Sequence, residues 1–128
     1  MKSNTNVQLA VFLLNERHEV KGAGRSVGQP RYAVRRIMEQ AIDLVAFNPR
    51  INQPRLVIVP LSTECATNMA TAIATAQFMS KTGQVVPTPE PEEISRVGRR
   101  AAMMSWFGKL AEAERLSRAR PIDGQRVA

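Results

Sequence analysis

Apolar residues along the chain form short β-prone runs that alternate with longer stretches of helical spacing. The run NVQLAVFLL, residues 6–14, is almost continuously apolar after Gln8, which predicts a strand covered on both faces. The run RLVIVPL, residues 55–61, predicts a second strand, and QVVP, residues 84–87, predicts a short third. Residues 18–21 are a candidate for a fourth.

Residues 30–47, PRYAVRRIMEQAIDLVAF, predict the first helix. Pro30 suits its first position, because the N–H that proline lacks would be unpaired there. The apolar positions that repeat at helical spacing predict the buried stripe: Val34, Ile37, Met38, Ala41, Leu44 and Val45.

Two further helices are predicted. One covers residues 62–81 and is closed by Gly83. The other runs from about Pro91 to Arg118, with a bend or break near Gly98 or Gly108. Its predicted buried stripe is Ile94, Val97, Ala101, Met104 and Phe107 or Gly108.

This order of strands and helices predicts an α/β fold, with a small parallel or mixed sheet of three to four strands and about three helices in a single domain. The compact domain is expected over residues 1–118, and residues 119–128 are expected to form a flexible basic tail. A sheet this small exposes its edges, and pairing with a second copy would cover them. We therefore expect a homodimer.

The charge favours a polyanionic partner. Among 128 residues there are 18 Lys and Arg against 11 Asp and Glu, which gives a net charge of +7. Arginine supplies 14 of the 18 basic residues, and its planar guanidinium is the better ligand for phosphate. The alternative is that the charge serves only solubility.

Composition argues against several other classes of protein. One cysteine cannot form an internal disulfide, and the lone His18 cannot complete a zinc site with it, so we expect no metal and no cofactor. The N-terminus lacks the pattern of a signal peptide. No apolar run approaches the roughly 20 residues of a membrane span. We expect a soluble intracellular protein without a membrane partner.

Two stretches could hold a small-molecule site. In PLSTEC, residues 60–65, Cys65 falls in the first turn of a predicted helix, where a thiol can be activated, but no base lies near it in the sequence. The stretch GAGRSVG, residues 22–28, has glycines in a G-x-G-x-x-x-G pattern that departs from the dinucleotide fingerprint. We interpret the first stretch as a structural corner of the fold, with Cys65 as a packing residue, and the second as a loop. A small enzyme or nucleotide-binding domain remains the alternative.

Basic residues form two candidate nucleic-acid-binding clusters. The first lies in the glycine-rich segment and the start of the first helix, and the second at the start of the last helix. Their members are Lys21, Arg25, Arg31, Arg35 and Arg36, and then Arg96, Arg99 and Arg100. Trp106 follows the second cluster and is either a core residue or a stacking platform. A threonine and alanine stripe on residues 63–75 suits either packing within the chain or self-association.

In size, charge and layout the chain resembles the minor core protein of the double-stranded RNA bacteriophages, the cystoviruses. The features that carry the resemblance are the α/β body and the arginine-rich stretches RYAVRR, RVGRR and RLSRAR. The resemblance implies a non-enzymatic homodimer in a viral core or the host cytoplasm. Such a protein assists assembly and RNA packaging or synthesis, with the polymerase, the shell protein and viral RNA as partners.

The sequence therefore predicts an RNA-binding accessory protein of a viral core that has no catalytic site. Two alternatives stay open. One is the small α/β enzyme or nucleotide-binding domain, and the other is a protein–protein adaptor that does not bind nucleic acid.

Overall fold

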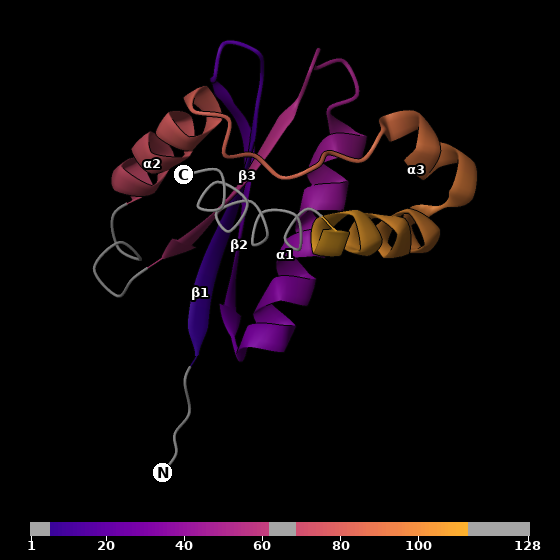
Figure 1. Ribbon diagram of the computed structural model, residues 1–128, viewed down its shortest axis with the longest axis horizontal. Helices are drawn as coiled ribbons and strands as arrows, with labels where there is room; N and C mark the ends of the chain where they lie inside the picture. The colour runs from indigo at the N-terminus through magenta and orange to yellow at the C-terminus, as the bar shows by residue number, and fades with distance from the viewer. Residues whose placement is uncertain (1–5, 62–68, 113–128) are drawn as a thin grey trace, which may run out of the picture.

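The computed structural model describes residues 6–61 and 69–112 (Figure 1). Three strands and three helices have defined bounds, and residues 99–112 form a further helix. In chain order the elements are β1 (Val7–Leu14), β2 (Val20–Gly28), α1 (Pro30–Phe47), β3 (Arg55–Leu61), α2 (Met69–Lys81) and α3 (Pro91–Val97). The sequence predicted β1, α1 and β3 nearly residue for residue.

The three strands form an antiparallel sheet in the order β2-β1-β3, so the prediction of a parallel or mixed sheet is wrong. β1 and β2 form a hairpin, and α1 then carries the chain across β1 to β3. This crossover leaves β2 and β3 parallel to each other, but β1 lies between them and pairs antiparallel with both. The error arose because β2 was not recognised as a strand.

The glycine-rich segment is strand β2 rather than a loop. Its glycines allow helix α1 to pack closely against the strand. A Cβ atom on Gly22 would lie 2.7 Å from Cδ2 of Leu44, and one on Gly24 would lie 2.1 Å from Oε1 of Gln40. Both contacts are closer than real Cβ atoms approach, so a side chain here would displace Leu44 or Gln40 from its place over the strand. The glycines thus serve packing, which removes the structural basis for a nucleotide-binding loop.

Gly24→Val should destabilise the protein by about 1–3 kcal/mol, because the new side chain must displace Gln40 from its place over the strand. The same displacement breaks the hydrogen bond of 2.9 Å from Gln40 Nε2 to the carbonyl of Arg25. Ala23→Val is the matched control, because Ala23 is exposed on the other face of β2. Urea unfolding should show the loss for position 24 only, and equal losses would contradict this account of the glycines.

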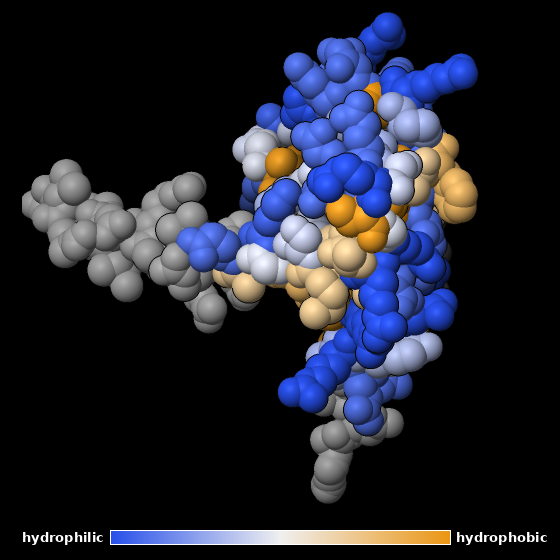
Figure 2. All heavy atoms as spheres, turned by 90° about the vertical axis from the view of Figure 1, so that its right-hand side faces the viewer, coloured by the Kyte–Doolittle hydropathy of each residue, from blue (hydrophilic) through white to orange (hydrophobic). Residues whose placement is uncertain are grey.

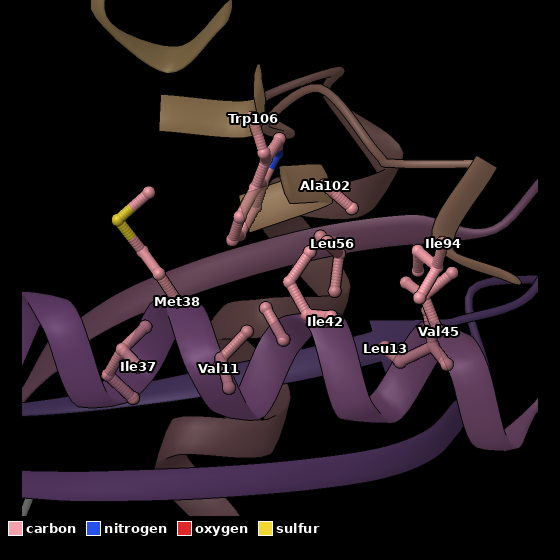
Figure 3. Close-up of a cluster of buried hydrophobic side chains, with 11 residues drawn as sticks. Val11, Leu13, Ile37, Met38, Ile42, Val45, Leu56, Ile94, Ala102 and Trp106 are labelled. Carbon is pink, nitrogen blue, oxygen red and sulfur yellow. The ribbon is translucent and has the colours of Figure 1, made fainter. Parts of the chain in front are cut away.

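Both faces of the sheet carry a hydrophobic core. On one face α1, α3 and helix 99–112 cover Val11 and Leu13 of β1 and Leu56 of β3 (Figure 3). On the other face α2 covers Phe12 of β1 and Val57 of β3 through its small alanines. The continuous apolar run of β1 reflects this burial on both sides.

Within the first helix the predicted stripe is largely correct, with one informative exception. Ile37, Met38, Ala41 and Val45 are buried, but Val34 keeps 44% of its surface exposed. Val34 lies one turn from the start of α1, where the sheet beneath it ends.

The last predicted helix is broken at Gly98, as the sequence indicated. Gly98 has a φ of 92°, a left-handed conformation that favours glycine, and helix 99–112 starts after it. Because the helix restarts there, the predicted stripe is wrong at Val97, Ala101 and Met104, which are exposed, whereas the predicted Phe107 does pack against the core and is partly buried. The fully buried residues of helix 99–112 are Ala102 and Trp106.

Two smaller predictions are corrected. The expected strand at residues 84–87 is reduced to an isolated bridge between Val86 and Leu56. In the described part of α2, the buried residues that pack on the sheet are Ala72 and Ala76, joined by the partly buried Ile73 and Met79. The predicted stripe (here Ala70, Thr71, Ala74 and Thr75) is exposed. No helix in residues 6–61 or 69–112 is long and apolar enough to cross a membrane.

Candidate nucleic-acid interface

Two adjoining hollows lie between α1 and helix 99–112, and together we call them the arginine groove. The apolar hollow has a volume of about 490 Å³ and is lined by Pro30, Arg31, Val34, Arg35 and Phe107. The charged hollow, of about 240 Å³, is lined by Arg35, Glu39, Arg99, Arg100 and Met103. Arg35 lines both, so the two hollows are neighbours. It brings together arginines of the two clusters that the sequence predicted separately.

Helix α1 supplies one wall of the groove. Arg31 and Arg35 are four residues apart and therefore lie on the same side of the helix, with Val34 beside them. All three are exposed, because the buried stripe of α1 faces the sheet.

Helix 99–112 supplies the other wall, and the contacts of Trp106 and Arg99 help to hold it in place. Trp106 is 1% exposed and points toward α1 in the cluster with Met38 and Leu56, while its indole N–H donates to the carbonyl oxygen of Pro87 (Figure 3). Arg99 makes a two-pronged ion pair with Asp43 of α1, at 2.7 Å from Nε to Oδ1 and 2.8 Å from Nη2 to Oδ2. Trp106 is thus a core residue, not a stacking platform.

The arginines of the groove differ in their availability to a ligand. Arg99 is occupied by Asp43. Arg35 has only a loose pair with Glu39 at 4.0 Å, which contributes little on an exposed surface. Within residues 6–61 and 69–112, the side chains of Arg31 and Arg100 have no hydrogen-bond or ion-pair partner. Arg31, Arg35 and Arg100 are therefore the side chains best placed to bind phosphate, and Glu39 is an acidic residue that lines the charged hollow and opposes it.

The other predicted binding residues lie outside the groove. Lys21 is at the hairpin end of β2 and pairs at 3.8 Å with Glu19, whose pKa is lowered first by a hydrogen bond from the Asn15 side chain and then by Lys21. Arg25 points to the opposite face of the sheet and donates to Gln8 Oε1 at 3.1 Å. Arg36 and Arg96 are exposed but line neither hollow.

The apolar part of the groove was not predicted. Phe107 and Val34 were both assigned to buried stripes, although Phe107 is only partly buried and Val34 is exposed. The available signal was their position next to arginines at helical spacing on both helices. Seen from the side on which α3 and helix 99–112 lie, hydrophilic residues surround small hydrophobic patches (Figure 2).

The structure gives the enzyme alternative little support. Cys65 and the helix start around it lie outside the described residues. His18 Nδ1 lies 2.8 Å from Ser80 Oγ, but Ser80 is fully buried and cannot reach a substrate, so the pair instead ties the β1–β2 hairpin to α2. No group of three or more potential metal ligands occurs in residues 6–61 and 69–112.

Comparison of the chain with protein-family models, with curated proteins and with solved structures found no match.

Proposed function

We propose that the chain is an RNA-binding accessory protein that holds the RNA backbone in the arginine groove. The observation that carries the proposal is that Arg31, Arg35 and Arg100, from two segments about 65 residues apart in sequence, line two adjoining hollows that share Arg35. Guanidinium groups bind phosphate by charge and by paired hydrogen bonds. A groove whose open charges are mostly arginine suits a polyanion better than a neutral ligand.

Binding through phosphate contacts is largely independent of sequence, which suits a packaging or assembly role better than recognition of one site. The resemblance to the cystoviral minor core proteins suggests the biological setting that we propose for this protein. In that setting the protein acts in a viral core, without catalysis, beside the polymerase and the shell protein. Co-purification with those two proteins from infected cells tests the setting separately from the RNA-binding activity.

The direct test of RNA binding uses the full chain and fluorescently labelled single- and double-stranded RNA. At low salt we expect binding that weakens steeply as salt rises, because each phosphate contact releases counterions. The adaptor alternative predicts no binding in the same titration, and a nucleotide-binding domain predicts saturation by mononucleotides with little dependence on salt.

We also propose that the protein is a homodimer. In the described residues β2 pairs only with β1, so its outer edge carries backbone groups without a strand partner. Sedimentation equilibrium at micromolar concentration should give about twice the chain mass of 14.2 kDa. A single species of one chain mass would remove the dimer from the proposal and leave the RNA groove intact.

A further inference from the structure

We infer that the arginine groove binds single-stranded RNA with one base seated in the apolar hollow against Phe107. The inference rests on the proposed function and adds to it the strand type and the way a base is held. It starts from the different chemistry of the two hollows: one is lined by apolar surface between two arginines, and the other is mainly charged.

The apolar hollow suits a flat ring system that is attached to a negatively charged group. Pro30, Val34 and Phe107 line it together with Arg31 and Arg35. In contrast to Trp106, Phe107 is only partly buried, so its side chain can meet a ligand. A nucleobase has the matching shape, and stacking of a base on an aromatic side chain contributes to single-strand binding in other proteins.

The charged hollow favours a nucleic-acid strand over a single small ligand. Arg35 lies at the border of both hollows, and Arg100 continues the positive charge along helix 99–112. A base beside Phe107 would place its own phosphate near Arg31 and Arg35, and the next phosphate along the chain toward Arg100. A fatty acid could enter the apolar hollow but carries no phosphate for Arg100.

A duplex cannot occupy the apolar hollow in this way, because its bases are paired and stacked inside the helix. Single-stranded RNA should therefore bind more tightly than duplex RNA at equal salt. The difference should come from the base contact, since both forms offer phosphates to the arginines.

The test compares a labelled ten-nucleotide single strand with the same sugar–phosphate chain lacking bases. The wild type should bind the base-bearing strand about 5- to 150-fold more tightly, the range expected when one base stacks on an aromatic side chain. Phe107→Leu retains an apolar side chain against the core but removes the ring, and it should abolish most of that preference. Met104→Leu, an exposed position on the same helix, is the control and should keep it.

Equal binding of both strands by the wild type would overturn the inference, and so would a Phe107→Leu variant that keeps the full preference. Binding of anionic phospholipid vesicles in a Phe107-dependent manner, with no preference for the base-bearing strand, would also overturn it. In each of these cases the salt-dependent contribution of the arginines can persist, so failure of the base contact is distinguishable from failure of RNA binding itself.

Discussion

Trp106→Ala should lower the free energy of unfolding by about 3–5 kcal/mol, the usual cost of removing a large buried aromatic side chain. Trp106 is 1% exposed and is the largest side chain in the core between α1, β3 and helix 99–112. Its removal leaves a cavity and deprives the carbonyl of Pro87 of its hydrogen-bond donor. The urea unfolding midpoint measures the loss.

Met104→Ala is the matched control, because Met104 lies on the same helix with 64% of its surface exposed. It should change stability by less than about 0.5 kcal/mol. If Trp106→Ala were equally mild, helix 99–112 would not be held by this contact, and the position of Arg100 opposite Arg35 would lose its support.

Replacement of Arg31, Arg35 and Arg100 together by alanine should weaken RNA binding by about 100-fold at 0.1 M salt. Each contact with a single strand contributes a slope of about −0.7 in log affinity against log salt, which corresponds to roughly fivefold at this salt relative to 1 M. All three side chains are exposed, so their loss should not unfold the protein. Arg99 is kept, because its pair with Asp43 holds the two helices together.

The matched control removes the same charge elsewhere. Arg17 lies in the hairpin turn, Arg50 follows the far end of α1, and Lys81 ends α2. All three are exposed and lie away from the groove, at the opposite ends of β1 and α1 from Pro30. Alanine at these positions should reduce affinity much less than the groove variant. A loss as large as that of the groove variant would mean that net charge, not the groove, binds the RNA.

Periodicity predicted the elements whose burial is simple. β1 is buried on both faces and reads as an unbroken apolar run, and α1 has a proline at its start and a regular stripe. Both could be bounded from the sequence because local preference and tertiary burial agree there.

The sequence failed where tertiary contacts override local preference. The alternate glycines of β2 indicate a loop by composition, but in the fold they make room for Leu44 and Gln40. Missing this strand turned an antiparallel sheet into a predicted parallel or mixed one. No local pattern shows which helix will lie over a strand, so the purpose of these glycines becomes visible only in the assembled structure.

The candidate site was partly predictable. The charge pattern predicted two arginine clusters, and in the structure Arg31, Arg35 and Arg100 line two adjoining hollows that share Arg35. The periodicity could not show that Arg99 would be occupied by Asp43, that Arg25 would face away, or that the apolar hollow would form. These depend on how helix 99–112 restarts after Gly98 and docks on α1.

The most direct test of the groove is the slope of log affinity against log salt for a labelled single-stranded RNA. For the Arg31, Arg35 and Arg100 triple-alanine variant, the account predicts a slope shallower than that of the wild type by about 2, from three contacts at about 0.7 each. Glu39→Gln should act in the opposite direction and raise affinity, since it removes the acidic group of the charged hollow. A slope unchanged by the triple replacement, or wild-type binding undetectable at low salt, would contradict the account.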